Sequence, residues 1–283
     1  MLVPSLISCA GLVCAGVTAA DGPAVRLVVR GDDMGSCHTA NVACVQCFRD
    51  GIMRTVEVMV PGPWYPEAVQ MLAECPGLDV GVHLTLTSEW SGVKWGPLTH
   101  APSLVDALGH FRPMNSQRDD FPPDTGFLEA RPDLAEVEAE LRAQIERALA
   151  DIKGASHLST HMGTPLLTPE LAAIADRLSR EYGLPLGLDD VGHFGGFGEG
   201  TDAPEQRAEA LAARVRGLEP GTWLLIEHPG LDTDEMRAMG HVGYEHVAND
   251  RAGVTAAFTS PGVRAAIDER GIGLLSYADL LRE

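Results

Sequence analysis

The sequence predicts an α/β fold in which parallel strands form a barrel. Short apolar or β-branched runs, which are typical of buried strands, alternate with helical patterns along almost the whole chain. This alternation implies a parallel sheet, and about seven such units favour a barrel over an open sheet. A chain of 283 residues can form one such domain, and no repeat or low-complexity linker divides it.

The amino-terminal half contains predicted strands at residues 25–29, 55–60 and 80–86 and predicted helices at residues 39–50 and 65–75. The next segment, residues 97–132, is rich in Pro, Gly, Asp and Ser and has little periodicity. Such a composition favours a long loop or lid over a cleft.

The carboxy-terminal half continues the pattern. Helices are predicted at residues 133–153, 169–182, 205–216 and 260–270, and strands at residues 155–158, 184–188, 222–227 and 272–276. A glycine-rich loop is expected at residues 192–200. In barrels of this kind the chemistry takes place where the carboxyl ends of the strands meet.

The negative charge of the chain limits the classes of molecule that it is expected to bind. The sequence contains 40 acidic and 21 basic residues, which give a formal net charge of −19. Such a surface repels phosphate backbones and anionic lipid, so nucleic acid and polyanionic glycans are poor candidate partners. The charge favours a neutral or cationic substrate, although it also explains solubility without any functional role.

Residues 1–20 resemble a secretory signal peptide. They contain no charged side chain, and the small residues Thr18, Ala19 and Ala20 end the apolar run. We therefore predict cleavage near Ala20 and export of one domain, residues 24–283, to the periplasm or the exterior. Without a signal the protein would be cytoplasmic. No other stretch is long and apolar enough for a transmembrane segment.

Six cysteines occur in the chain, two of them in the predicted signal. Cys44 and Cys47 form a C-x-x-C pattern, but a zinc ribbon requires a second pair and a thioredoxin-like site requires another context. We expect the four remaining cysteines, Cys37, Cys44, Cys47 and Cys75, to be small buried side chains. Export makes a disulfide feasible, and the sequence leaves the pairing open.

Two adjacent carboxylates, Asp32 and Asp33, follow the first predicted strand. Burying both as ions is costly unless a cation lies nearby, and a divalent metal would supply one. Successive side chains of an extended chain point apart, so we expect one carboxylate to bind the metal and the other to act as a general base. Gly35 allows a sharp turn after them. The alternative is a turn that caps the following helix.

Two histidines complete the predicted metal site. His83 lies within the third predicted strand, and His161 follows the strand at residues 155–158. His157 has the spacing of a second ligand on a helix, but its strand context favours packing or support of a ligand. One carboxylate and two imidazoles leave coordination positions open, as in catalytic zinc sites. Zinc is the expected metal, with magnesium, cobalt or nickel as alternatives. His83 could instead be a hydrogen-bonded core residue.

His228 is a further candidate for chemistry. It follows a predicted strand within Glu227-His228-Pro229-Gly230 and could protonate a leaving amine. The alternative is again a hydrogen-bonded histidine at a strand end. The remaining histidines lie in loop or helix contexts, where we expect surface or lid residues.

Several motifs together resemble those of the YdjC-type carbohydrate deacetylases, a family of chitooligosaccharide and hopanoid-associated deacetylases. They include Gly31-Asp32-Asp33-Met34-Gly35, Gly81-Val82-His83-Leu84-Thr85-Leu86-Thr87, His228-Pro229-Gly230 and Ser276-Tyr277-Ala278-Asp279-Leu280. The resemblance implies a distorted (β/α) barrel and hydrolysis of the N-acetyl group of an amino sugar or oligosaccharide. It implies that the metal ligands are Asp33, His83 and His161. It further implies that Asp32 is the base and His228 the acid.

One motif departs from the family pattern. The family has His-x-Asp-Ser-His-Gln-His where this chain has His157-Leu158-Ser159-Thr160-His161-Met162-Gly163. The metal histidine is retained, but an acidic neighbour and a following histidine are lost, which puts ligand orientation and substrate contacts in doubt. Trp64, Trp90 and Trp95 could stack on sugar rings, and packing is the more ordinary role for Trp64.

Two other functions stay open at the level of sequence. One is a metal-dependent amidase or esterase that acts on a non-sugar substrate with the same barrel and metal. The other is a non-catalytic exported glycan-binding protein, for which the altered motif is the only support. Besides a small N-acetylated sugar, the one partner considered is a second copy of the chain in a homodimer.

Overall fold

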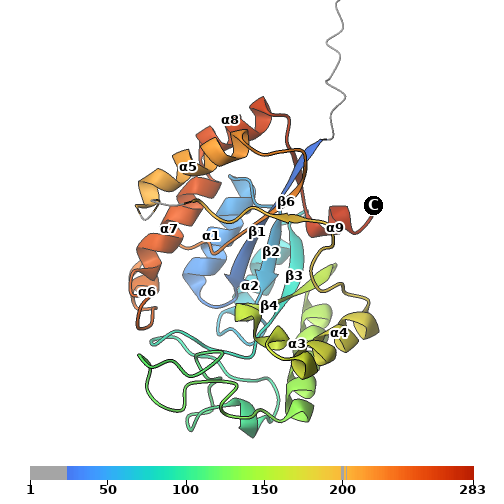
Figure 1. The fold of residues 1–283 in the computed structure, drawn as a ribbon, viewed down its shortest axis with the longest axis vertical. Helices are drawn as coiled ribbons and strands as arrows, with labels where there is room; N and C mark the ends of the chain where they lie inside the picture. Colours follow the sequence, from blue (N-terminus) through green and yellow to red (C-terminus); the bar gives the residue numbers. More distant parts are fainter. Residues whose placement is uncertain (1–23, 199–200, 202) are drawn as a thin grey trace, which may run out of the picture.

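The computed structural model describes residues 24–198, 201 and 203–283, which form a parallel sheet surrounded by helices (Figure 1). The predicted signal peptide lies outside the described residues. The 7-stranded sheet contains β1 (Val25–Met34), β2 (Thr55–Val58), β3 (Asp79–Leu84), β4 (His157–Thr160), β5 (Gly192–His193), β6 (Gly221–Glu227) and β7 (Gly273–Leu275).

The strands pair in the order β4-β3-β2-β1-β6-β5, all in parallel, and β7 pairs with the first part of β1. The sheet forms a half-barrel, which agrees with the distorted (β/α) barrel expected from the sequence. A closed TIM-like barrel is not formed, because no ladder joins the edge strands β4 and β5 within the described residues.

The gap between the two edges coincides with the strand predicted at residues 184–188. That prediction is wrong, because only Leu186 forms a bridge, with Leu158 of β4. Pro185 lacks an N–H for a ladder, and Gly187 has a positive φ of 88°. The chain then continues to Gly192 in β5 at the opposite edge.

Helices surround the half-barrel sheet (Figure 1). They are α1 (His38–Arg49), α2 (Tyr65–Ala73), α3 (Leu134–Asp151), α4 (Pro169–Tyr182), α5 (Pro204–Arg216), α6 (Asp234–Arg237), α7 (Val247–Phe258), α8 (Pro261–Glu269) and α9 (Tyr277–Leu280), with 3₁₀ turns η1 (Pro102–Leu104) and η2 (His161–Leu166). Helix α5 packs against α7 and α8, and α3 packs against α4.

Local sequence explains where the longer helices begin and end. Asp133 accepts a hydrogen bond from the N–H of Ala135 at the start of α3. Thr168 caps α4, Pro169 occupies its first turn, and Gly183 ends it in a left-handed conformation with φ 65°. The predicted α-helical segments agree with these elements to within a few residues, whereas α7 was not predicted.

The long segment predicted as a loop is irregular and is anchored to α3. It contains η1 and single bridges such as Val105 to Phe111. The buried Glu140 of α3 accepts hydrogen bonds from the N–H groups of Leu98 (3.1 Å) and Thr99 (2.9 Å). These bonds fix the start of the segment against the body of the protein.

Two further sequence expectations concern cysteines and membranes. Cys37, Cys44, Cys47 and Cys75 are buried and unpaired, as expected for small core side chains. None of the helices in the described ranges has the length and hydrophobicity needed to cross a bilayer.

Candidate metal centre

Asp32 and Asp33 lie in a β-bulge near the end of β1. The register of β1 against β2 shifts between Gly31 and Met34, and Asp33 has a positive φ of 70°. A left-handed residue in a bulge breaks the alternation of side chains along the strand. Both carboxylates therefore face His83: Asp32 Oδ2 lies 3.8 Å and Asp33 Oδ1 lies 3.7 Å from its Nε2. The expectation that the two side chains point apart is wrong for this reason.

Hydrogen bonds hold the turn that follows the bulge. The carbonyl of Asp33 accepts from the N–H (3.2 Å) and the hydroxyl (2.7 Å) of Ser36. The buried Asn41 of α1 accepts from the N–H of Gly35 at 2.7 Å. Cys37, rather than either aspartate, caps α1. The aspartates are thus free of the capping role that the sequence left open.

Two imidazoles from neighbouring strands face the Asp33 carboxylate. His83 belongs to β3, and His161 follows directly after β4. One ligand atom from each of the three buried residues lies within 4.8 Å of the other two. His161 Nδ1 is 3.2 Å from Asp33 Oδ1. That oxygen is buried and has no hydrogen-bond partner in the described part of the chain, as expected for an atom that binds a cation.

Two arginines hold the carboxylates from behind. Arg30 donates to both oxygens of Asp32, at 2.7 and 2.8 Å. Arg251 of α7 donates to Oδ2 of Asp33 at 2.8 Å. Neither arginine was predicted from the sequence. Arg30 could have been found, since it lies two residues before Asp32 on the same face of the strand. Arg251 carries no comparable local signal.

Neighbouring positive charges keep Asp33 ionised. Burial alone would raise the pKa of Asp33, but the charges of Arg251, His228 and His161 hold that pKa well below its usual range. Asp33 is therefore a carboxylate at neutral pH and can act as a metal ligand.

The two imidazoles differ in their electrostatic surroundings. Burial lowers the pKa of His83 to about 4, although Asp32 opposes this shift. Burial also disfavours the charged form of His161, but Glu89 and Asp33 raise the pKa of His161 to about 10. Without a metal, a protonated His161 would thus help to compensate Asp33. A bound cation would take over that role.

Glu89 lies directly behind His161. Its Oε2 is 2.9 Å from Nε2 of His161, on the side of the ring opposite Asp33. A carboxylate in this position orients an imidazole and increases its basicity as a ligand. Glu89 was not singled out from the sequence, because it lies in an irregular segment after β3.

The connected cluster around the site carries an excess of negative charge. It contains four buried carboxylates and two buried guanidinium groups, those of Asp32, Asp33, Glu57, Glu89, Arg30 and Arg251. With neutral imidazoles these groups leave two negative charges uncompensated. A buried Asp–His–His group in such a cluster fits a divalent metal ion.

His228 lies at the end of β6, next to the bulge. The register of β6 pairs Glu227 with Gly31, so that His228 follows at the level of the aspartates. The next turn is docked on α7: the N–H of Gly230 donates to Thr255 Oγ1 at 3.1 Å, and its carbonyl accepts from the same hydroxyl at 2.6 Å. Helix α7 therefore positions both the half-buried His228 and the arginine that holds Asp33.

The family model described as YdjC-like protein matches residues 26–269. The chain belongs to the YdjC-like family. A carbohydrate deacetylase from Thermus thermophilus is 31% identical, over 75% of this chain and 80% of that protein. A chitooligosaccharide deacetylase from Yersinia pestis is 29% identical, over 89% of this chain and 98% of that protein. The family resemblance seen in the sequence motifs is confirmed.

A solved structure has the same fold as this YdjC-like chain. It is that of a proposed cellobiose-phosphate cleavage protein from Enterococcus faecalis, with a TM-score of 0.70 and 23% identity. The similarity covers 91% of this chain and 99% of that one. At this level of identity the likeness concerns the fold alone.

The altered motif of this YdjC-like chain brings Ser159 and His157 into a buried polar network. Ser159 Oγ is 2.7 Å from Nδ1 of His83 and also bonds Glu57. Nε2 of His157 is 2.6 Å from Glu57 Oε1, and its ring stacks on Tyr277 with centroids 4.0 Å apart. His157 is thus placed as a supporting residue, outside the group of possible ligands.

The three tryptophans differ from the sequence expectation. Trp90 and Trp95 are 2% and 3% exposed, whereas Trp64 is 40% exposed. The indole expected to pack is therefore the one available at the surface.

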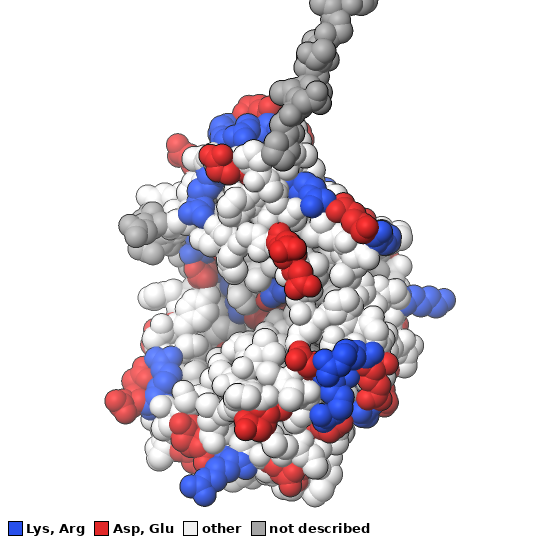
Figure 2. Space-filling view, turned by 45° about the vertical axis from the view of Figure 1, so that its right-hand side comes forward, with Lys and Arg blue, Asp and Glu red and all other residues white. Residues whose placement is uncertain are grey.

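Figure 2 shows that acidic and basic side chains alternate over one face of the molecule, and that this face is hollowed, with charged atoms at depth.

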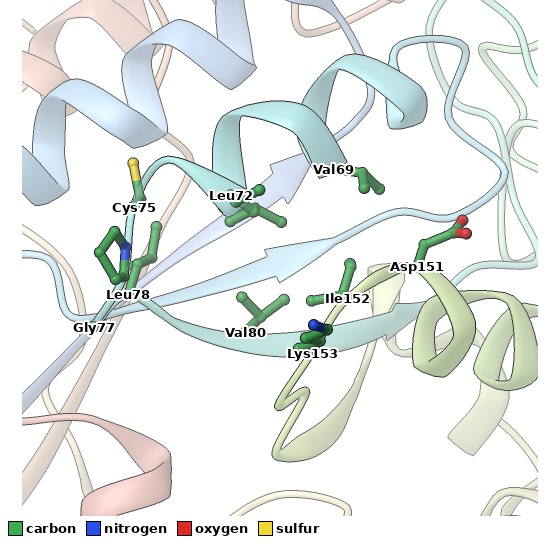
Figure 3. Close-up of a pocket in the computed structure, with 11 residues that line it drawn as sticks. Val69, Leu72, Cys75, Gly77, Leu78, Val80, Asp151, Ile152 and Lys153 are labelled. Carbon is green, nitrogen blue, oxygen red and sulfur yellow. The ribbon is translucent and has the colours of Figure 1, made fainter.

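A separate cavity of about 460 Å³ lies between α2, β3 and the end of α3 (Figure 3). Its walls include the apolar side chains of Leu72, Val80 and Ile152, and Asp151 and Lys153 contribute charged groups. No candidate metal or catalytic residue lines it. The cavity is therefore distinct from the site described above.

Proposed function

We propose that this YdjC-like protein is a metal-dependent carbohydrate deacetylase that hydrolyses the N-acetyl group of an amino sugar or oligosaccharide to acetate and a free amine. The observation that carries the proposal is the convergence of Asp33, His83 and His161 within 4.8 Å in a buried, negatively charged cluster. Relatives named as carbohydrate and chitooligosaccharide deacetylases support the substrate class.

The metal would be held by Asp33 Oδ1, His83 Nε2 and His161 Nδ1. One carboxylate and two imidazoles favour zinc, with cobalt, nickel or magnesium as alternatives. When bound, a divalent metal acts as a Lewis acid toward the acetamide carbonyl and lowers the pKa of a bound water. Three protein ligands leave room in the coordination shell for water and substrate.

Asp32 would serve as the general base. It lies beside the proposed ligands, with Oδ2 3.8 Å from His83 Nε2, but is not one of the three. The two hydrogen bonds from Arg30 fix its orientation. A carboxylate held in place can accept the proton of the water that attacks the acetyl carbon.

His228 would serve as the general acid. An amine leaves an amide only when its nitrogen receives a proton, and a histidine can deliver one near neutral pH. The bonds between Gly230 and Thr255 hold the turn that carries His228. After acetate has left, Asp32 would release to the solvent the proton that it took from water, and His228 would regain a proton from the solvent.

The proposal is tested by metal analysis of the purified protein together with acetate release from N-acetylated chito-oligosaccharides. We expect one divalent metal ion per chain, acetate release, and the loss of both in Asp33→Ala. The variant Asp268→Ala, which removes an exposed carboxylate from α8, is the matched control and should keep both. A faster reaction with non-sugar acetamides or aryl acetates would indicate an amidase or esterase. Glycan binding without acetate release would indicate a binding protein.

We also propose that the protein is exported. The support is the uncharged, apolar composition of residues 1–20, with small residues before Asp21. Expression of the full chain, cell fractionation and sequencing of the mature amino terminus test this proposal. A protein that stays in the cytoplasm with residue 1 or 2 at its terminus would contradict it.

A further inference from the structure

A chain of buried hydrogen bonds runs from His83 into the centre of the half-barrel. Nδ1 of His83 is 2.7 Å from Ser159 Oγ, and the Ser159 hydroxyl bonds Oε2 of Glu57. Glu57 is fully buried, and Ser159 and His83 are 5% and 2% exposed. Water therefore has little access to these groups, and their protons must be shared among themselves.

The backbone explains why these side chains meet. His83 and Ser159 are register partners in β3 and β4, so their side chains lie next to each other. Gly81 is the register partner of both Glu57 in β2 and His157 in β4. A Cβ at Gly81 would collide with both side chains, so only glycine allows them to meet across β3.

The chemistry of the groups sets the direction of the hydrogen bonds. An ionised carboxylate only accepts, so Ser159 must donate its single hydroxyl proton to Glu57. The Ser159 oxygen is then left as an acceptor for Nδ1–H of His83. In a neutral imidazole a protonated Nδ1 leaves the Nε2 lone pair free. That Nε2 is the atom 3.7 Å from Asp33 Oδ1.

The surroundings of Glu57 keep it ionised. Burial alone would raise the pKa of Glu57, but His157 and Arg30 hold that pKa well below its usual range. Nε2 of His157 lies 2.6 Å from Oε1, and Nε of Arg30 lies 3.8 Å from the same oxygen. The second oxygen, Oε2, is left to accept from Ser159.

We propose that Glu57 acts through Ser159 to fix His83 in the tautomer whose Nε2 can bind the metal. Both are positioning residues, and the inference rests on the proposed metal site. Glu89 contacts Nε2 of His161, the nitrogen turned away from Asp33, directly, whereas Nδ1 of His83 is linked to a carboxylate through the hydroxyl of Ser159. The Ser159 hydroxyl is needed to link Glu57 to His83, because the hydrogen bond between Glu57 and His157 keeps the carboxylate away from the His83 ring.

The first test measures zinc affinity by calorimetry on metal-free protein. Ser159→Ala removes the relay, and Glu57→Gln places an amide that can donate to Ser159 and reverse the hydrogen bond to His83. We expect each to weaken zinc binding about 10-fold to 100-fold, the range found when groups behind metal ligands are lost. Thr85→Val is the matched control, because the Thr85 hydroxyl donates to the carbonyl of His83 rather than to its ring. It should bind zinc as the parent does.

The second test is a rescue. In the double variant Glu57→Gln, Ser159→Asp, a carboxylate is supplied directly to Nδ1 of His83. We expect its zinc affinity to exceed that of both Glu57→Gln and Ser159→Ala and to lie within about threefold of the parent. The single variant Ser159→Asp places two carboxylates in contact and should bind zinc less well than the double variant.

The third test determines the tautomer of His83 in metal-free protein. Nitrogen-15 shifts of histidine-labelled, metal-free protein should show His83 protonated at Nδ1 in the parent and in the double variant. Ser159→Ala and Glu57→Gln should lose this signature. Parent protein that binds no zinc would overturn the proposed function, while the tautomer would still test the relay. Parent protein that binds zinc, together with variants of equal affinity and unchanged tautomer, would overturn the relay.

Discussion

Arg251 donates to Oδ2 of Asp33 at 2.8 Å and leaves Oδ1 of the same carboxylate facing the two imidazoles. The guanidinium also lies over the ring of Trp90, 4.9 Å from its centroid. Its Nε and Nη1 are buried without a hydrogen-bond partner among the described residues. Among the described residues, Arg251 therefore donates its side-chain hydrogen bond to Asp33 alone. Its positive charge compensates part of the Asp33 charge from the side opposite the proposed metal.

The first prediction follows from this pairing. Arg251→Met keeps the apolar stem but leaves Asp33 as a buried charge without its partner. Removal of one member of a buried pair costs about 3–5 kcal/mol of unfolding free energy. We expect a loss of this size in metal-free protein, measured by urea unfolding with chelator. Saturating zinc should stabilise the variant more than the parent, because the metal then compensates a carboxylate that has lost its arginine.

A surface pair provides the control for this prediction. Arg177 and Glu138 form an ion pair between α4 and α3 in which both side chains are substantially exposed. Arg177→Met should change the unfolding free energy by less than about 1 kcal/mol. Equal effects of the two substitutions would show that Arg251 does not compensate Asp33.

The second prediction separates the base from the ligands. Asp32→Asn should retain the metal, because Asp32 is not one of the three converging residues. An amide cannot accept the proton of the attacking water, and general base catalysis contributes about 10²–10⁴ in rate. We therefore expect kcat for acetate release to fall at least about 100-fold with unchanged metal content. Full activity of Asp32→Asn would mean that another group is the base.

Those residues of the candidate site that lie at the ends of strands could be predicted from the sequence. Asp33, His83 and His161 lie at or near the carboxyl ends of β1, β3 and β4, and a parallel sheet brings these ends together. The short apolar and β-branched runs were sufficient to locate these strands. The side-chain directions of Asp32 and Asp33 could not be predicted, because they depend on a bulge and a left-handed residue that no period-2 pattern encodes.

Helix α7 shows the other limit of prediction. Its residues Val247–Phe258 are buried on most sides and include Gly253, so they lack the polar stripe from which a helix is recognised. The sequence therefore contains no indication that Arg251 pairs with Asp33, although Arg251 is buried against that carboxylate. The strand expected at residues 184–188 failed for the opposite reason, since an apolar run was read as a strand in spite of Pro185 and Gly187.

The third prediction concerns pH and Glu227, the residue before His228. Burial, with Asp250 and Asp32 adding to it and Arg207 opposing it, raises the pKa of Glu227 from 4.5 to about 7. The folded state therefore holds a proton between about pH 4.5 and 7 that the unfolded state has released. Stability contributed by this group is present below that window and is lost as the pH rises through it.

The variant Glu227→Gln isolates this contribution. The shift corresponds to about 3 kcal/mol, which we reduce to about 1–2 kcal/mol because the side chain is partly exposed to solvent. Relative to the parent, the variant should gain about 1–2 kcal/mol of unfolding free energy between about pH 4.5 and pH 8. Urea unfolding of both proteins across this range provides the comparison. A constant difference between them would mean that Glu227 titrates normally.

The fourth prediction tests His228 through the leaving group. An amine must be protonated to depart, whereas an aryl alcohol leaves readily as an anion, so only the amide reaction needs a strong general acid. We expect His228→Asn to lower kcat for an N-acetylated sugar by about 100-fold and to have a much smaller effect on an aryl acetate, with metal content unchanged. His193→Asn, at an exposed position in β5, is the control and should leave both reactions intact. Equal losses on the two substrates would instead assign His228 to binding or to the compensation of Asp33, whose pKa it also lowers.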